Sequence, residues 1–474
     1  MAGLGGTIGL GGMDFKDLFL GPLYLALFYG LAYAVRPRFT NPLTKRYFIP
    51  ALSVKFLGAF SLGLIYQFYY QGGDTLNYFN ESKAIYDAFW DSPSIGIRLL
   101  LSNDGSYDPD MGKYVALIHW YDAQTEYFVV KVCGFLSLFC FHSYSVVALM
   151  FAILSFSGVW ALYNTFLRLY PHLYKQLAIS VFFIPSVFFW GSGISKDALC
   201  IGALGWLFYG FYNLLVSRTR PVAAIMALLI GGIVLQSVKI YILISFLGPV
   251  MVWVATQQSA KIKSSVVRAL VLPVLLLIGA VIGFFASQKI AEGNQNYDFD
   301  KIEDRAKVAS TYHNEISQDE SGKARGMGNS GYHMDDFTGP ADIPKLAPKA
   351  IVIGLFRPFV WEVRNPVMLL SAFEVLWITF LTARVFYRTG LFKTFSRIGS
   401  TPLILFSIIF SVLFAIGTAI TSGNFGNLVR YRIPMWPFYV TALFVLQDDF
   451  VRRKAKPKKR RVLPPRRPQL AGAA

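Results

Sequence analysis

Residues 142–164 read HSYSVVALMFAILSFSGVWALYN, an apolar stretch without Asp, Glu, Lys or Arg whose length decides the fold class. A helix rises about 1.5 Å per residue, so this stretch is long enough to cross the hydrocarbon core of a bilayer. Backbone polar groups in lipid must be bonded within the segment itself, and a helix meets that requirement. We therefore expect a transmembrane helix here.

Comparable apolar runs recur along the whole chain. It has 474 residues, of which 54% are hydrophobic and 15% charged, more apolar surface than one soluble core would bury. The short alternating strands of a membrane barrel are missing. The sequence predicts an all-α, polytopic transmembrane helix bundle of about eleven spans, near residues 17–35, 48–71, 142–164, 176–192, 196–216, 222–238, 240–257, 266–286, 366–383, 401–420 and 432–447.

The basic residues indicate the orientation of the bundle. Alternate connections are rich in Lys and Arg and contain no Asp or Glu, and the tail after residue 451 is also basic. By the positive-inside rule this face is cytoplasmic and the N-terminus lies outside. The charge of +18 is explained by this distribution, so we expect no nucleic-acid partner. The cations in the connections are Arg36, Arg38, Lys45, Arg46, Arg168, Lys175, Arg218, Arg220, Lys261, Lys263, Arg268, Arg384, Arg388, Lys393 and Arg397.

The same alternation divides the chain into regions. Residues 1–451 form the bundle, with large outer loops at 72–125 and 287–349, and 452–474 form a disordered basic cytoplasmic tail attracted to anionic headgroups. An odd number of crossings is needed between Asp74 and Arg168, so 127–141 is expected to lie at the outer interface, as is 350–362. No cleavable signal peptide is evident. The cysteines, which lack metal-ligand spacing, are expected to be structural: Cys133, Cys140 and Cys200.

Asp74 is the candidate catalytic residue. It lies in GGDTLNYFNESKAIY (72–86), directly after the second span, where the two glycines allow close approach to the backbone. A carboxylate at this place could act as general base for a sugar hydroxyl. The alternative is a helix-start residue, because Asp-Thr before a helical stretch is also a start signal.

Two stretches place further charges at the outer membrane boundary. PSVFFWGSGISKD (185–197) breaks a helix before Lys196 and Asp197, and Lys239 lies in a tight hairpin. The lysines could bind a phosphate. The alternatives are ion pairs with neighbouring groups, a favourable position of Asp197 in a helix first turn, and snorkelling of Lys239.

Three more candidates precede the ninth span. Arg357, Glu362 and Arg364 lie among aromatic residues and form a plausible phosphate or sugar cradle, although such aromatics are also ordinary interface anchors. Glu374 lies deeper, within the span, and needs a partner.

The last outer loop holds two arginines among aromatics and prolines, Arg430 and Arg432. Arginine binds phosphate oxygens in a bidentate manner, which suits the pyrophosphate of a lipid carrier. All candidate residues map to the outer face, so we expect them to meet in one cavity. The outer carboxylates do not have the spacing of a metal site, so no cofactor is predicted, although a divalent metal stays open.

These motifs resemble a known family. The GDT element, PSVFFWGSGISKD and the late NFGNLVRYRIPMWP (424–437) are similar to the multispanning sugar-transferring proteins of bacterial envelope polysaccharide pathways. These include the GT-C glycosyltransferases, which use polyprenyl-phosphate sugars, and the O-antigen or exopolysaccharide repeat-unit polymerases. The resemblance implies that Asp74 activates the acceptor and that the late arginines hold the donor phosphate. In contrast to the GT-C pattern, the loop follows the second span and Asp74 is paired only with Thr75, which favours a polymerase.

The resemblance also implies a location and partners. We expect a multi-pass protein of the bacterial cytoplasmic (inner) membrane that transfers a sugar or glycan from a polyprenyl-phosphate-linked donor at the outer face. Its partners would be the lipid bilayer, that lipid-linked glycan and other envelope polysaccharide assembly proteins. The alternatives are a transporter or flippase of a lipid-linked glycan or other polar lipid, and a non-catalytic scaffold in an envelope complex.

Overall fold

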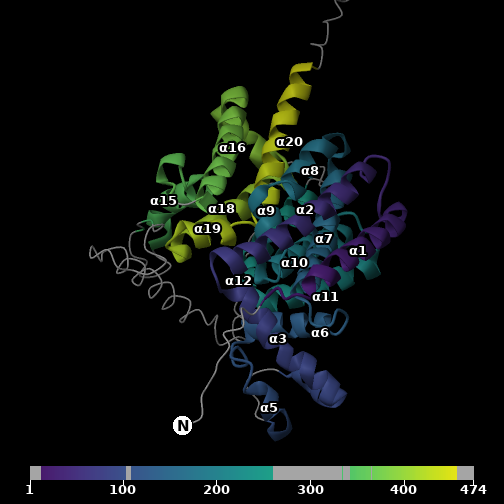
Figure 1. The fold of residues 1–474 in the computed structure, drawn as a ribbon. Coiled ribbons are helices and arrows are strands. Elements are labelled where there is room, and N and C mark those ends of the chain that lie inside the picture. Colours follow the sequence, from purple (N-terminus) through teal and green to yellow (C-terminus); the bar gives the residue numbers. More distant parts are fainter. Residues whose placement is uncertain are drawn as a thin grey trace, which may run out of the picture.

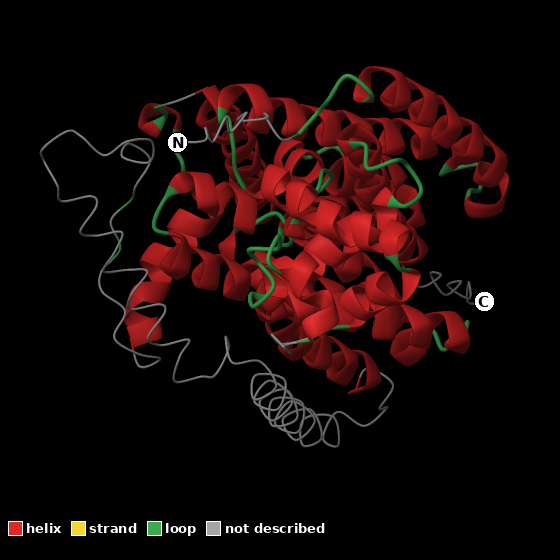
Figure 2. Ribbon diagram, turned by 60° about the horizontal axis from the view of Figure 1, so that its bottom comes forward, coloured by secondary structure: helices red, strands yellow, loops and turns green. Residues whose placement is uncertain are grey.

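The structure is a computed structural model that describes residues 12–102, 108–259, 332, 334, 342–364 and 366–455. Within these ranges the elements are helices and no β-strand is formed, as Figure 2 shows. The predicted all-α class is therefore confirmed for this part of the chain.

Eight of the described helices are long and apolar enough to cross a membrane. They coincide with eight of the predicted spans. The predicted total of about eleven stays a prediction, as does the orientation. The helices are α1 (Asp17–Phe39), α2 (Lys45–Leu64) with η1 (Ile65–Tyr69), α7 (Tyr144–Leu169), α10 (Lys196–Phe211) with η4 (Tyr212–Val216), α11 (Pro221–Val238), α12 (Ile240–Ser259), α16 (Pro366–Thr389) and α18 (Pro402–Ser422).

The other three predicted spans differ from these eight. The stretch 176–192 is divided into α8 (Tyr174–Phe182) and α9 (Pro185–Trp190), because proline disfavours a helical conformation in the residue before it. The predicted span 432–447 corresponds to α20 (Trp436–Ala455), which begins four residues later than predicted and includes the first residues of the predicted tail. The stretch 266–286 and the tail from 456 onward lie outside the described residues.

The predicted first outer loop is largely helical. It contains α3 (Asp74–Asp91), α4 (Pro93–Leu101), η2 (Pro109–Met111) and α5 (Gly112–Val115). The stretch 127–141, expected at the interface, forms α6 (Gln124–Ser137), which packs against α3 and is too short to count among the candidate spans. Of the second loop, only Tyr332, Met334 and residues from 342 are described. The remaining helices are η3 (Pro171–Leu173), α15 (Ile343–Phe356), η6 (Val360–Glu362), α17 (Leu391–Ser400) and α19 (Phe425–Tyr431).

Small residues allow the central helices to approach closely. A Cβ on Gly158 of α7 would overlap the backbone of Gly202 in α10, and one on Gly205 would overlap the carbonyl of Gly158. Helices in membranes associate through such close backbone contact, because lipid supplies no hydrophobic driving force between them. The α7–α10 pair is therefore the centre of the bundle.

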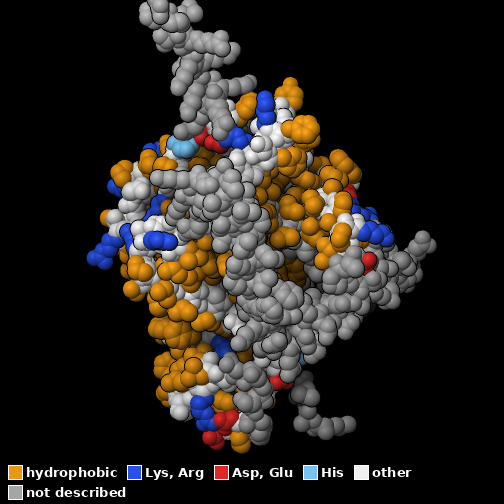
Figure 3. All heavy atoms as spheres, turned by 180° about the vertical axis from the view of Figure 1, so that it is seen from behind, with side chains coloured by type: hydrophobic (Ala, Val, Ile, Leu, Met, Phe, Trp, Pro, Cys, Tyr) orange, Lys and Arg blue, Asp and Glu red, His pale blue; other side chains and the backbone are white. Residues whose placement is uncertain are grey.

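The charged connections separate into two ends of the molecule. At one end, buried Asp17 of α1 accepts hydrogen bonds from the Ser143 hydroxyl (2.6 Å) and the Ser145 amide (2.7 Å), which joins the starts of α1 and α7. At the other end, His172 contacts Asp448 at 2.8 Å. Figure 1 shows α3 and α5 at one end of the bundle and the end of α20 at the opposite one. Broad areas of hydrophobic side chains cover the face drawn in Figure 3, as a lipid-facing surface requires.

Candidate functional site

Four ionisable side chains from distant parts of the chain meet where several helices end, and we call them the four-charge cluster: Asp74, Asp197, Lys239 and Arg430. Lys239 Nζ lies 2.5 Å from Asp197 Oδ1, and Arg430 Nε lies 2.5 Å from Asp197 Oδ2. Arg430 Nη1 donates to Asp74 Oδ2 at 3.0 Å. Asp197 thus joins Lys239 to Arg430, and Arg430 joins both to Asp74, so three of the sequence-predicted site residues are brought together.

Local sequence positions each member of the cluster. Asp74 begins α3 directly after Gly73, which has φ +118°, and a Cβ there would lie 2.6 Å from the ring of Tyr66. Only glycine combines that backbone angle with that contact. Asp197 lies in the first turn of α10, whose N-cap Ser195 accepts a hydrogen bond from the Ala198 amide at 3.1 Å.

The remaining two members come from a hairpin and a short helix. Lys239 is the single residue between α11 and α12, so its backbone direction is set by both spans. Arg430 lies on α19, after the last residues of α18. The tight hairpin expected from the sequence at Lys239 is therefore present.

The exposed fraction of the side chain differs among the four members of the cluster. The side chains of Asp197, Lys239 and Arg430 are 2%, 8% and 14% exposed, whereas that of Asp74 is 48% exposed. A buried carboxylate is tolerated only when it is paired, and both oxygens of Asp197 are. Burial opposes the charged form of Lys239, but the Asp197 carboxylate outweighs it and raises the pKa of Lys239. The buried Lys239 is therefore held in its charged form by Asp197.

Aromatic side chains surround the cations. Lys239 Nζ lies 4.6 Å from the centre of the Tyr431 ring, and Arg430 Cζ lies 5.8 Å from that of Trp190. Beside Asp74 and Arg430 is a cavity of about 10 Å³, also lined by Tyr66, Trp190 and Ser195. This is room for about one water molecule, so a sugar would need the cavity to open further.

Lys196 lies next to Asp197 in sequence but is not part of the cluster. Its Nζ forms an ion pair with Glu126 and donates to Thr125 Oγ1 at 3.0 Å, both on α6. The sequence had left open that Lys196 and Asp197 pair with neighbouring groups, and the structure shows such pairs for both.

A second group of the predicted residues lies around the end of α15. Arg357 Nε donates to the two oxygens of Glu362 at 2.9 and 3.1 Å, and the Phe359 amide donates to Glu362 at 2.7 Å. Burial raises the pKa of Glu362, but these hydrogen bonds outweigh it and hold the pKa below its ordinary value. The side chain of Arg364, two residues after η6, is exposed.

Arg432 is fully buried, unlike Arg430. Its Nη1 donates to the carbonyls of Gly354 (3.3 Å) and Arg357 (2.5 Å), and its Cζ lies 5.1 Å from the Trp436 ring. The guanidinium therefore joins the last helices to α15. A ligand in solution would not reach it in this arrangement, and its predicted phosphate contact stays a prediction.

Two buried ionisable groups lie inside the bundle. Glu374 was expected to need a partner within its span, and it accepts hydrogen bonds from the Ser186 amide (2.7 Å) and hydroxyl (2.6 Å). Lys55, which sequence reasoning missed, donates to Ser155 Oγ at 3.0 Å and to the Gly191 carbonyl at 2.6 Å. The sequence could have identified Lys55, because it is the one residue among Asp, Glu, Lys, Arg and His within the predicted span 48–71.

The described residues contain no group of three or more His, Cys, Asp or Glu side chains that could hold a metal ion. The three cysteines are buried and free, in packing positions. No protein-family model, curated protein or solved structure matches this chain. The resemblance to sugar-transferring membrane proteins therefore rests on the quoted motifs alone.

Proposed function

We propose that the chain is a membrane glycosyltransferase or polysaccharide polymerase that uses a polyprenyl-phosphate-linked donor, with Asp74 and Arg430 at its reaction centre. The observation that carries the proposal is the 3.0 Å contact between these two side chains, which are 356 residues apart in the sequence. One is a half-exposed carboxylate and the other a largely buried guanidinium. A general base and a phosphate-binding group must be neighbours for group transfer, so this contact supports the proposal.

The geometry of Arg430 supports a phosphate-binding role. Its Nε is held by Asp197 and its Nη1 by Asp74, and Nη2 donates to none of the described residues. The guanidinium is thereby fixed in orientation, and one edge still has a donor for a phosphate oxygen. A phosphate bound there would compete with Asp74 for Nη1, which would free the carboxylate to accept a proton.

The proposed reaction needs one bond to form and one to break. The oxygen of an acceptor hydroxyl attacks the anomeric carbon of the donor sugar as the bond from that carbon to the phosphate oxygen breaks. The hydroxyl proton passes to Asp74, and the leaving phosphate keeps the bonding electrons while Arg430 balances its charge. The side chains do not change oxidation state, and no metal is required by this scheme.

Asp74→Asn tests this proposal, with Asp87→Asn as its matched control. Both residues lie on α3 and their side chains are about equally exposed, but the one ion pair of Asp87 within the described residues is with Lys83, at 2.7 Å. In a deletion strain of the source organism, the Asp87 variant should restore the envelope glycan. The Asp74 variant should accumulate the lipid-linked unit on the outer leaflet, where an added membrane-impermeant glycosidase can reach it. Full glycan synthesis by the Asp74 variant would contradict the proposal that Asp74 is the general base.

A transporter or flippase is the second candidate, because the bundle contains a helix break with buried ionisable groups. The broken stretch from α8 to α10 accepts a hydrogen bond from Lys55 and donates two to Glu374. Discontinuous helices with such groups mark many substrate pathways in transporters. In that case the same deletion would trap the lipid-linked unit on the inner leaflet, protected from the glycosidase.

A further inference from the structure

A second polar pocket lies at the opposite end of the bundle from the four-charge cluster, in the predicted cytoplasmic face. It has a volume of about 610 Å³ and lies between the ends of α1, α7 and α10 and the start of α11. Three arginines line it, and its lining contains no Asp or Glu: Arg38, Arg168 and Arg220. We call it the arginine pocket.

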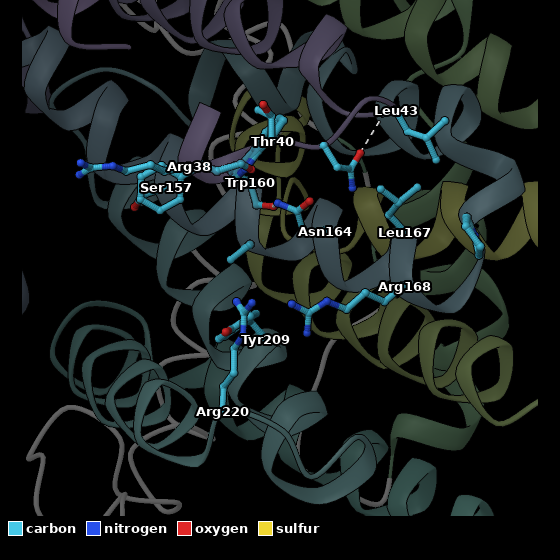
Figure 4. Close-up of a pocket in the computed structure, with 14 residues that line it drawn as sticks. Arg38, Thr40, Leu43, Ser157, Trp160, Asn164, Leu167, Arg168, Tyr209 and Arg220 are labelled. Atoms are coloured by element: carbon cyan, nitrogen blue, oxygen red, sulfur yellow. Dashed lines mark hydrogen bonds between the residues drawn. The ribbon is translucent and has the colours of Figure 1, made fainter. Parts of the chain in front are cut away.

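The three cations have no counter-ion among the described residues. Arg168 Nη1 donates to the neutral Asn213 side chain at 2.8 Å, whereas the guanidinium groups of Arg38 and Arg220 form no hydrogen bond or ion pair with the described residues. Figure 4 shows Arg168 and Arg220 extending toward Tyr209, whereas the side chain of Arg38 extends in another direction, past Ser157. Clustered like charges without a counter-ion favour binding of an anion.

The loop that carries Arg220 is ordered by its own hydrogen bonds. The Thr219 amide donates to the Asn213 carbonyl at 2.9 Å, and the Thr219 hydroxyl donates to Asn213 Oδ1 at 3.0 Å. Asn213 also accepts the hydrogen bond from Arg168, so this one buried side chain orients the Arg168 guanidinium and the loop that carries Arg220. Such preorganisation lowers the cost of binding an anion between them.

The surroundings of the pocket favour a lipid over a soluble anion. The two helices at its rim, α1 and α11, are the least buried of the candidate spans, with only 11% and 22% of their apolar windows buried. Phe39, which lines the pocket, is 60% exposed, and Val222, two residues after Arg220, is 75% exposed. A headgroup in the pocket could therefore leave its acyl chains on these apolar surfaces.

We propose that the arginine pocket binds the phosphate headgroup of an anionic phospholipid. The inference does not depend on the proposed sugar transfer, because it uses none of the same residues. The bound lipid would join the end of α1 to the start of α11 and so would stabilise the fold.

The test compares two charge-matched double variants of the full chain, Arg168→Gln/Arg220→Gln and Arg384→Gln/Arg388→Gln. The second pair lies at the end of α16, on the same predicted face but outside the pocket. Each protein is equilibrated in detergent with dioleoyl-phosphatidylglycerol or dioleoyl-phosphatidylcholine, and bound lipid is counted by native mass spectrometry. A further sample adds inorganic phosphate as competitor.

Wild type and the α16 variant should retain phosphatidylglycerol in preference to phosphatidylcholine. The pocket variant should lose roughly 30-fold in affinity for phosphatidylglycerol, from about 1 kcal/mol for each basic residue near a lipid headgroup. If the pocket variant does not fold, Arg220→Gln alone should lose roughly fivefold, because Arg220 is exposed and holds no described group.

Three outcomes would overturn the proposal. Equal losses in the two double variants would show a general surface charge effect instead of a site. Equal binding of phosphatidylglycerol and phosphatidylcholine by wild type would show that the pocket does not select an anionic headgroup. Displacement of all the lipid by inorganic phosphate would indicate a site for soluble phosphate.

Discussion

Asp197→Asn should destabilise the protein strongly, because Asp197 neutralises two buried cations at once. The substitution keeps the size of the side chain and removes its charge. Lys239 then has no described carboxylate partner, and Arg430 keeps only the half-exposed Asp74. Removing one partner of a buried ion pair typically costs about 3–5 kcal/mol, so we expect a loss in this range.

The magnitude is checked by unfolding the protein with SDS in mixed micelles and following tryptophan fluorescence. Asp87→Asn is the control, since the Lys83–Asp87 pair is exposed and should contribute about 1 kcal/mol or less. The double variant Asp197→Asn/Lys239→Met removes the unpaired lysine together with its partner. It should recover at least half of the stability lost in Asp197→Asn, and a double-mutant cycle gives the coupling energy.

An Asp197→Asn protein that unfolds at the same SDS fraction as wild type would refute this reasoning. It would mean that water reaches the cluster and screens its charges, in which case the buried ion pairs do not hold the helix ends together. Failure of Lys239→Met to rescue would instead show that Asp197 acts mainly through Arg430.

Three further predictions concern other parts of the bundle. Burial lowers the pKa of His142 to about 4 from its ordinary 6.5, so on acidification the unfolded chain takes up the proton before the folded one does. The free energy of unfolding should therefore be constant above pH 6.5 and fall by about 3 kcal/mol as the pH approaches 4. In SDS titrations from pH 7 to 4, His142→Gln should weaken this pH dependence. Lys55→Met should leave the SDS midpoint of unfolding unchanged or raise it, because it removes a buried cation that has no described counter-ion. The Gly191 carbonyl still accepts a hydrogen bond from the Ser155 hydroxyl, at 2.7 Å. A loss of about 2 kcal/mol or more in the free energy of unfolding would contradict this expectation. Gly158→Val should force α7 and α10 apart and lower the free energy of unfolding by at least about 2 kcal/mol, with loss of folded protein in size-exclusion chromatography. The control is Gly30→Val, because a Cβ at Gly30 meets no atom within 4 Å, and this variant should elute as wild type does.

Much of the fold could be predicted from the sequence because lipid imposes simple rules on each segment separately. A long apolar run in lipid favours a helix because its backbone must be bonded within the segment, so eight spans were placed with their ends within six residues of the observed ones. The break before α9 follows in the same way from Pro185, and the tight turn at Lys239 from the short polar interval between two apolar runs. The sequence indicated a helix start at Asp74 only as an alternative, and the other helices of the loop 72–125 were missed because they have nine residues or fewer and are stabilised by packing.

The grouping of candidate residues at one end of the bundle was also predictable, since the alternation of basic connections assigns each helix end to a face. This is why Asp74, Lys239 and Arg430 could be expected to meet. The arginines of the opposite face were interpreted only as topology signals, because their charge fits the rule. That three of them line one pocket was not visible in the sequence.

The partners of each side chain were decided by the tertiary structure alone. Neighbouring residues on a helix point about 100° apart, so Lys196 reaches α6 while Asp197 reaches Lys239 and Arg430. Arg430 and Arg432 differ by about 200° in the same way, and one lies beside Asp74 while the other is buried against α15. The sequence determined which residues lie at each end of each helix, because hydropathy and charge act along the chain. The rotation of each helix about its axis, which selects the residues that touch, depends on how all the helices pack together.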